Sequence, residues 1–155
     1  MHISPQEAHH VAVLAGQGEC AKLTAAVKAL ARREHESPAN ILIACKDDFQ
    51  QTAAHIAAKS GQSKSIDTLA DLLDDDEKRA AYFNMANRFS GDRPIHTAMR
   101  HGYLDAFKAL VTHGADPTMK NRFGDIVEDY PGDFDPEEVS QVVEDYRTRM
   151  DKLKA

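Results

Sequence analysis

The segment Asp92–Gly102 reads DRPIHTAMRHG, and an earlier segment, Gln51–Gly61, reads QTAAHIAAKSG. Both contain the spacing His-x-Ala-x-x-x-Gly, which places His96 and His55 at equivalent positions. A second run with apolar residues at helical spacing follows each segment. Such self-similarity is typical of repeat proteins, in which each unit buries its apolar face only against its neighbours. The sequence therefore predicts pairs of helices stacked one on the next.

A weaker copy of the pattern opens the chain as HVAVLAG at His10–Gly16. We align its histidine with the other two, and we expect Gly16, Gly61 and Gly102 to permit a left-handed turn between paired helices. The segments that connect the copies also match one another, which predicts loops of one kind: Asp47–Phe49, Asn87–Phe89 and Asn121–Gly124.

These motifs resemble those of the ankyrin-repeat family. TAAH at Thr52–His55 and RPIH at Arg93–His96 are similar to the Thr-Pro-Leu-His signature, and GADP at Gly114–Pro117 is similar to the Gly-Ala-Asp that closes a repeat. The resemblance implies an all-α ankyrin-repeat solenoid, with projecting hairpin loops and histidines that hold the start of each first helix. It places repeats at about 5–40, 47–80 and 88–120, with a truncated fourth at 121–130 that completes a domain over 1–130.

The spacing of the copies departs from the family. The signature histidines are 45 and 41 residues apart, whereas the usual ankyrin period is about 33 residues. The surplus falls around Arg32–Asn40 and around Asp74–Met85. We expect the segment Asp74–Phe83 of the second surplus to extend the outer helix of its repeat or to add a turn.

The last segment, 131–155, predicts an acidic linker and a capping helix. Asp135 is a suitable N-cap and Pro136 a suitable first helical residue. An apolar stripe follows at helical spacing, formed by Val139, Val142, Val143, Tyr146, Met150 and Leu153. Because the last repeat of a stack needs a cap with a polar outer face, we interpret this helix as a cap. A partner-binding helix is the alternative.

The charge distribution indicates what kind of partner to expect. The net charge is −6, yet residues 1–123 are balanced, and the stretch 124–145 carries nine acidic side chains and no basic one. Since the chain has no basic stripe that could bind a phosphate backbone, we expect no nucleic-acid binding. No apolar run approaches the roughly 20 residues that span a bilayer, so we expect no membrane insertion. A protein with a basic surface is the partner that the charge favours.

The sequence contains few features that indicate catalysis. It contains no nucleotide-binding loop and no zinc motif, and the histidines of the repeats have structural roles, so we expect no metal, no cofactor and no enzymatic activity. Cys20 and Cys45 lie in apolar stretches and predict two free thiols. We therefore expect a monomer in a reducing compartment, namely the cytoplasm, or the cytosol of a host cell if a bacterium delivers the protein there.

The resemblance also implies where a partner would bind, since ankyrin repeats hold partners with their loop tips and inner helix face. Carried over position by position, it selects residues that flank the signatures. They are Asp48, Phe49, Gln51, Lys59, Ser60, Arg88, Phe89, Asp92, Arg100, His101, His113, Arg122, Phe123 and Asp125. An alternative for the three phenylalanines is that they only pack the loops against one another.

Three functions follow from this sequence. The first is a non-catalytic protein–protein interaction module that uses the loop tips and the inner helix face. The second is a chaperone or inhibitor that masks a basic client with the acidic C-terminal stretch. The third, an enzyme or metal-binding protein that uses the histidines, is the least favoured.

Overall fold

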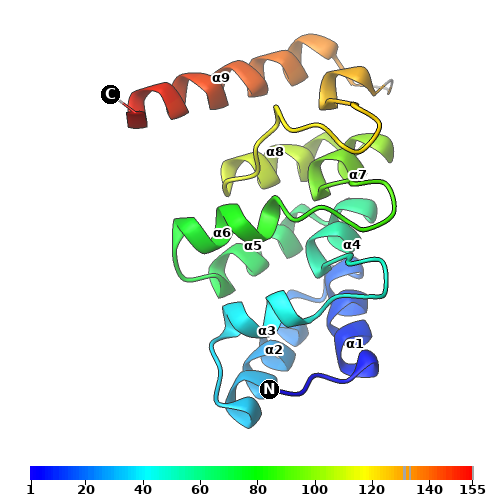
Figure 1. Cartoon of the computed structure of the whole chain (residues 1–155), viewed down its shortest axis with the longest axis vertical. Helices are drawn as coiled ribbons and strands as arrows, with labels where there is room; N and C mark the ends of the chain where they lie inside the picture. Colours follow the sequence, from blue (N-terminus) through cyan, green and yellow to red (C-terminus); the bar gives the residue numbers. More distant parts are fainter. Residues whose placement is uncertain (131, 133, 155) are drawn as a thin grey trace.

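The computed structural model describes residues 1–130, 132 and 134–154. Pro131, Asp133 and Ala155, which belong to the predicted C-terminal segment, lie outside the described residues. Figure 1 shows a stack of helices that runs from the N-terminal to the C-terminal end of the chain. The elements are α1 (Pro5–Gly16), α2 (Cys20–Glu34), α3 (Pro38–Ala44), α4 (Ala53–Lys59), α5 (Ser63–Leu72), α6 (Asp76–Phe83), α7 (Pro94–Arg100), α8 (Leu104–Thr112), the 3-10 turn η1 (Val127–Asp129) and α9 (Pro136–Lys154).

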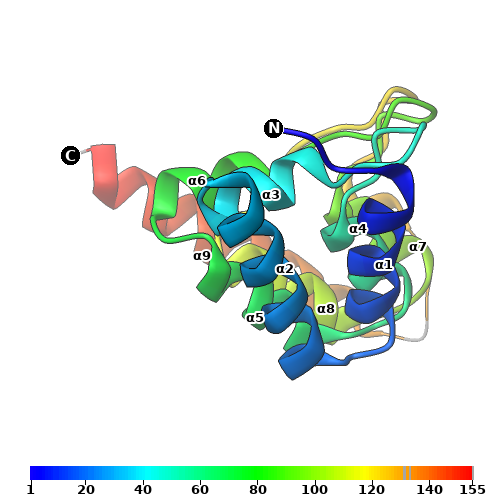
Figure 2. The same ribbon diagram turned by 90° about the horizontal axis from the view of Figure 1, so that it is seen from below.

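Three helix pairs build the stack: α1 with α2, α4 with α5, and α7 with α8. The first helices of the pairs pack on one another as an inner layer, and α2, α5 and α8 form an outer layer beside them. Seen along the stack in Figure 2, the two layers are separate and the connecting loops project from the inner side. The predicted all-α repeat solenoid is therefore confirmed.

The signature residues start the inner helices as the sequence predicts. Thr52 is the N-cap of α4, and the His55 Nδ1 atom accepts a hydrogen bond from the Thr52 backbone N–H at 3.0 Å. In α7, Pro94 occupies the first turn, and His96 Nδ1 accepts from the Arg93 backbone N–H at 3.0 Å. Each histidine thus pairs one of the backbone donors that a helix start leaves unsatisfied.

The same two rings also connect neighbouring repeats. Because Nδ1 is an acceptor in both, the neutral ring carries its proton on Nε2. His55 Nε2 donates to the Asp92 carbonyl at 2.9 Å, and His96 Nε2 donates to the Met119 carbonyl at 3.0 Å. Helices α4 and α7 are thereby each tied to the loop of the next unit. Burial lowers the pKa of His55 to about 4 and also lowers the pKa of His96, so both rings are neutral at pH 7.

The His96→Ala variant should lower the free energy of unfolding by about 1–3 kcal/mol, because it leaves the Arg93 N–H and the Met119 carbonyl without their partner. The control is His10→Ala, since His10 is exposed and forms no side-chain hydrogen bond within the described chain. Chemical denaturation of both variants measures the difference. Equal losses would contradict the structural role of His96.

The first repeat differs from the alignment predicted for it. Helix α1 has 12 residues, against seven in α4 and in α7, and it begins with a capping box between Ser4 and Glu7. Gly18, with φ of 72°, adopts the left-handed conformation at the end of the helix, and Gly16 is still helical. The predicted roles of His10 and Gly16 were therefore wrong, because the longer helix shifts the register of the motif.

The surplus residues start two further helices, and α2, with 15 residues, is also longer than α5 with 10 and α8 with 9. Helix α2 ends at Glu34, its C-cap His35 is left-handed with a φ of 54°, and Ser37 caps the new helix α3. Asp75 likewise caps α6, and its carboxylate accepts from the Lys78 backbone N–H at 2.7 Å. The segment Asp74–Phe83 therefore neither extends α5 nor adds a single turn, because the Asp75 cap starts a separate helix there.

The C-terminal helix closes the stack. The Asp135 carboxylate accepts from the Glu137 backbone N–H at 2.9 Å, at the start of α9. Val139 and Val143 are buried against the last repeat, whereas Leu153 is 74% exposed. Val142 and Tyr146 also pack against the core, so the first four residues of the predicted apolar stripe cover its end. Figure 1 shows the C-terminal part of α9 extending beyond the body of the stack.

Candidate partner-binding loops and groove

The three loops that precede α4, precede α7 and follow α8 have the same internal design. The carboxylate of Asp47 accepts the backbone N–H groups of Phe49 and Gln51, each at 2.9 Å. The side-chain oxygen of Asn121 accepts those of Phe123 and Asp125, also at 2.9 Å. Asn87 Oδ1 accepts the Ser90 N–H at 2.9 Å in the middle loop. An Asp or Asn side chain thus fixes each turn by bonding to the backbone that follows it.

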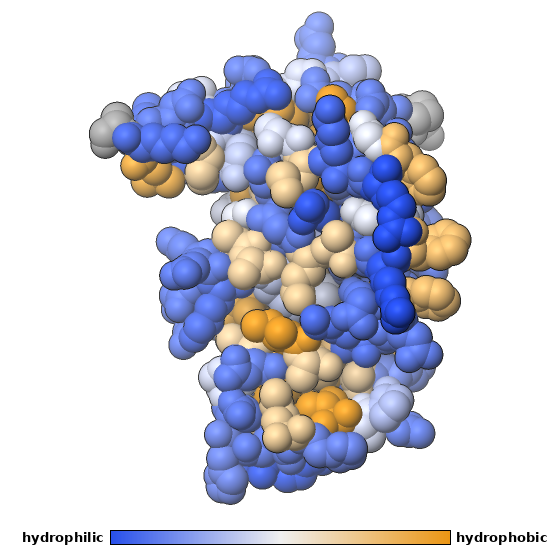
Figure 3. All heavy atoms as spheres, in the orientation of Figure 1, coloured by the Kyte–Doolittle hydropathy of each residue, from blue (hydrophilic) through white to orange (hydrophobic). Residues whose placement is uncertain are grey.

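Each loop presents a phenylalanine to solvent. The exposed fractions are 55% for Phe49, 74% for Phe89 and 70% for Phe123. In Figure 3 hydrophobic side chains stand along the edge of the molecule where Figure 1 places the three loops. The Phe49 and Phe89 rings are in edge-on contact, with centroids 6.3 Å apart. These two rings pack together, as the alternative predicted, yet all three remain accessible to a partner.

The loops are also hydrogen-bonded to one another. The Arg88 backbone N–H donates to the Phe49 carbonyl at 2.6 Å, and the Arg122 N–H donates to the Ser90 carbonyl at 2.9 Å. The Arg122 guanidinium donates to the carbonyls of Phe89 and Arg88, each at 2.9 Å. Arg122 therefore fixes the last loop to the middle one, in addition to any contact it makes with a partner.

A polar cluster supports the loops from behind. Asp92 is only 5% exposed, and its carboxylate accepts from Arg100 Nη2 at 2.7 Å and from Asn121 Nδ2 at 2.9 Å. The Arg100 guanidinium also lies over the Tyr130 ring, 5.4 Å from its centroid. The predicted partner contact at Asp92 is therefore replaced by a supporting role, because the carboxylate is buried and already paired.

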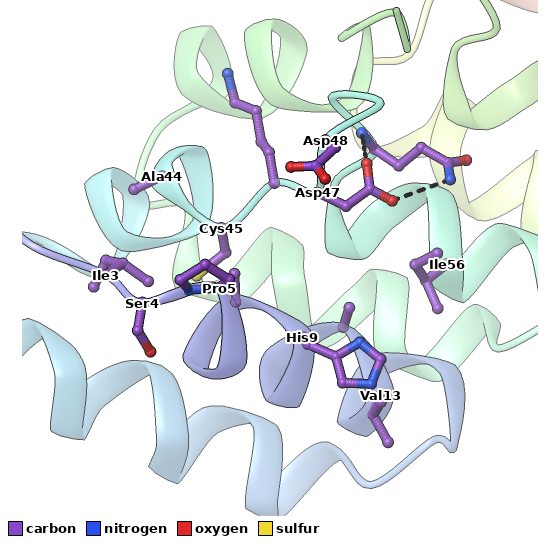
Figure 4. Close-up of a pocket in the computed structure, with 14 residues that line it drawn as sticks. Ile3, Ser4, Pro5, His9, Val13, Ala44, Cys45, Asp47, Asp48 and Ile56 are labelled. Carbon is purple, nitrogen blue, oxygen red and sulfur yellow. Dashed lines mark hydrogen bonds between the residues drawn. The ribbon is translucent and has the colours of Figure 1, made fainter. Parts of the chain in front are cut away.

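A groove opens between α1 and the first of these loops. Its volume is about 340 Å³, and Figure 4 shows side chains from α1, from the loop and from α4 around it. It is lined by Ile3, Ser4, Pro5, Ala8, His9, Ala12, Val13, Ala44, Cys45, Lys46, Asp47, Asp48, Gln51 and Ile56. Most of these side chains are apolar, and the polar ones come mainly from the loop.

Two carboxylates on the loop side of the groove differ in their hydrogen bonding. Asp47 is engaged by its own loop, including Gln51 Nε2 at 3.3 Å. Asp48 is exposed and makes no hydrogen bond or ion pair with any residue that the structure describes. Burial, followed by the nearby Glu7 charge, raises the pKa of the Cys45 thiol to about 11, so this thiol stays protonated. Asp48 and Lys46 are thus two charges of opposite sign at the groove that have no partner among the described residues.

The remaining predicted residues do not all join this surface. Lys59 and Ser60 lie at the end of α4 that is farther from the loops, and His101 follows the corresponding end of α7. Desolvation, and then the charges of Lys59 and Arg100, lower the pKa of His101. The structure thus gathers one part of the predicted set at the loops, namely Asp48, Phe49, Gln51, Arg88, Phe89, Arg122, Phe123 and Asp125.

His113 lies on the outer layer instead of the inner helix face. Its Nε2 atom is 2.8 Å from the Asp67 carboxylate of α5, and its ring lies 6.2 Å from the Phe83 ring of α6, measured between centroids. The prediction that His113 belongs to the inner binding face was wrong, because it terminates the outer helix α8.

The residues predicted from the sequence do not include the α1 side of the groove, where Ile3, Pro5 and Val13 lie. The signal was present in the Ser-Pro-Gln-Glu run at Ser4–Glu7, which is a capping box with proline at the first helical position. Reading that run as a helix start would have lengthened α1 and placed these residues opposite the loop.

Side chains that could bind a metal ion are not clustered in the described part of the chain. Over residues 1–130, 132 and 134–154, no three His, Cys, Asp or Glu side chains come close enough to hold a metal ion. Cys45 is buried and Cys20 half-buried, and both are free.

None of the helices in the described part of the chain is both long and apolar enough to cross a membrane.

Comparison with known proteins agrees with this architecture. A model of the family described as ankyrin repeats (3 copies) matches residues 9–121. The chain therefore belongs to the ankyrin-repeat family, whose members are in general protein-interaction modules without catalytic activity.

The chain is also similar to two known proteins. An ankyrin repeat-containing protein from Caenorhabditis elegans, F37A4.4, is 41% identical over 44 residues, which are 28% of this chain and 4% of that protein. A chain in the crystal structure of the yeast ribosomal protein Rps3 in complex with its chaperone Yar1 is 24% identical, with a TM-score of 0.70. That match covers 94% of this chain and 93% of the yeast chain, and it shows a shared fold.

Proposed function

We propose that this ankyrin-repeat protein binds a segment of another protein across its loop tips and in the groove beside α1. The observation that carries the proposal is the row of exposed rings at Phe49, Phe89 and Phe123 on loops that hydrogen bonds hold in place. Aromatic side chains are frequent anchors of protein interfaces, and exposed apolar groups on a fixed support favour association because little order is lost on binding.

The groove suggests the chemistry of the bound segment. Its apolar lining, with Ile3, Val13 and Ile56, suits an aliphatic or aromatic side chain. Asp48 at the rim suits a lysine or arginine next to that side chain, because the carboxylate has no internal partner among the described residues. We therefore propose a partner segment that combines an apolar anchor with a basic residue.

Phe89→Ala should weaken binding by about 1 kcal/mol or more, since truncating an aromatic anchor removes its contact with the partner. The matched control is Leu153→Ala, because Leu153 on α9 has the same 74% exposure and lies away from the loops. A partner isolated by affinity capture and identified by mass spectrometry would be titrated by calorimetry against both variants. Equal affinities for the two variants would reject the loop-tip site.

A second candidate function is that of a chaperone or inhibitor for a basic client. The nine acidic side chains of residues 124–145 support it, and Glu137 and Glu138 among them are exposed on α9. The fold similarity to a chain from the Rps3–Yar1 complex is compatible with it. Association driven by these charges would slow steeply as salt is raised, whereas binding to the apolar groove would not. Association rates at two salt concentrations therefore distinguish the candidates.

We also propose that the protein acts without catalysis in a reducing compartment such as the cytoplasm. The free thiols of Cys20 and Cys45 support this, since disulfides are rare there. Counting thiols under denaturing conditions tests the proposal, and a disulfide in protein purified from its natural source would contradict it.

A further inference from the structure

The turns between paired helices form a series along the stack, and each contains a glycine with positive φ. From the position that a Cβ would take on Gly18, the Gln62 side chain is only 2.7 Å away. From the same position on Gly61, the Tyr103 ring is 2.5 Å away. Gln62 directly follows Gly61, and Tyr103 directly follows Gly102. In both turns the glycine is therefore covered by the residue that follows the glycine of the next repeat. Around Gly102, the last of the series, no heavy atom of the described chain lies within 4 Å of that position, apart from atoms of Gly102 and its two chain neighbours.

The uncovered turn opens into a pocket of about 430 Å³ at the end of the helices that is opposite the loops. It is lined by Gly61, Gly102, Tyr103, Leu104, Asp105, Phe134, Asp135 and Glu138. The pocket therefore combines residues of the last complete repeat with the first turn of the capping helix. Two aromatic rings and three carboxylates contribute to it, and its lining includes no lysine or arginine.

The carboxylates of the pocket are only partly engaged. Asp105 is exposed and has no hydrogen-bond partner within the described part of the chain. Asp135 uses one oxygen to accept from the Glu137 N–H. Glu138 has only a long ion pair with Lys108, at 3.8 Å. Negative charge thus remains available beside Tyr103, whose ring is 42% exposed.

We propose that this pocket binds an arginine side chain from a basic segment of a partner protein. A guanidinium group is planar, so it can lie over Gly102 as the Tyr103 ring lies over Gly61. It stacks on aromatic faces and pairs with carboxylates in a fixed geometry, which a lysine ammonium does not match. The site is separate from the loops and the groove, and it gives part of the acidic stretch a defined ligand.

The test uses the whole chain, labelled with nitrogen-15, and three synthetic peptides. The first peptide alternates glycine with arginine, and the other two carry lysine or citrulline in place of arginine. Citrulline keeps the shape of arginine but lacks its charge. The arginine peptide should shift the Gly102 and Tyr103 amide signals saturably, the lysine peptide should bind more weakly, and the citrulline peptide should leave both signals unchanged. Equal binding of the citrulline peptide, or no shift at Gly102, would overturn the proposal.

Two neighbouring carboxylates provide a matched pair of variants. Glu138 lines the pocket and Glu137 does not, although both are exposed and both lie in the first turn of α9. Glu138→Gln should weaken binding of the arginine peptide about two- to fivefold, as expected for an exposed charge pair, and Glu137→Gln should have a smaller effect. Equal losses would show a general attraction to acidic charge and would overturn the specific pocket. Tyr103→Leu, which retains an apolar cover over Gly61, should also weaken binding.

Discussion

Replacing Tyr82 by alanine should lower the free energy of unfolding by about 3–5 kcal/mol, the range typical of aromatic truncations in a core. Tyr82 and Phe83 are both fully buried at the end of α6, with their ring centroids 5.5 Å apart in an edge-on arrangement. They attach this short inserted helix to the repeats, so removing either ring leaves a cavity where α6 meets the core. Urea denaturation followed by circular dichroism would measure the loss.

The control for this prediction is Tyr82→Phe. The Tyr82 hydroxyl is buried and has no hydrogen-bond partner among the described residues, and burial raises its pKa well above the usual value. Removing an unsatisfied buried hydroxyl should be neutral or slightly stabilising. If Tyr82→Phe destabilised the protein as much as Tyr82→Ala, the hydroxyl rather than the ring would hold α6 in place.

Acidification should destabilise the protein through His55, with the loss developing between about pH 6.5 and about pH 4. The folded state lowers the pKa of this ring from 6.5 to about 4, mainly by burial. Below the unfolded pKa the unfolded chain binds a proton that the folded chain does not, so stability falls as the pH falls, until the folded ring is protonated too. The full effect is about 3 kcal/mol at 1.36 kcal/mol per pKa unit.

A variant isolates this contribution from those of other groups. His55→Gln removes the titrating ring, so its stability should vary less with pH over this interval than that of the wild type. Denaturation at a series of pH values gives both slopes. An unchanged slope in His55→Gln would contradict a buried neutral histidine, although His96 adds a loss of the same sign.

The parts of the fold that were predicted correctly are those with their own local signals. Thr52 and Pro94 define where α4 and α7 begin, and Gly61 and Gly102 define where their turns lie, because each residue type favours that backbone conformation. The first repeat was misaligned because α1 is longer than α4 and α7. The motif match at His10–Gly16 therefore did not show which residues of α1 are equivalent to those of the other inner helices. The start signal at Ser4–Glu7 was the more reliable guide.

The candidate site was predictable only in part, and for a similar reason. The loop phenylalanines share a fixed position after an Asp or Asn, so their common exposure follows from the repeat. The contacts of His55 with the Asp92 carbonyl and of Arg122 with the Phe89 carbonyl involve backbone acceptors. Every residue has such an acceptor, so the sequence gives no sign of which one is used. The groove depends on packing between α1 and a distant loop, which local patterns do not encode.

The hydrogen bonds that run from loop to loop have a consequence for binding kinetics. The backbone N–H of Arg88 is hydrogen-bonded to Phe49, and that of Arg122 to Ser90. The three loop tips therefore form one preorganised surface and do not move independently. Once one ring has engaged a partner, the other two are held nearby at high effective concentration, and little further conformational entropy is lost. A partner would then dissociate mainly when the contacts at all three loops break together. A substitution that disrupts one loop would therefore shorten the lifetime of the whole complex.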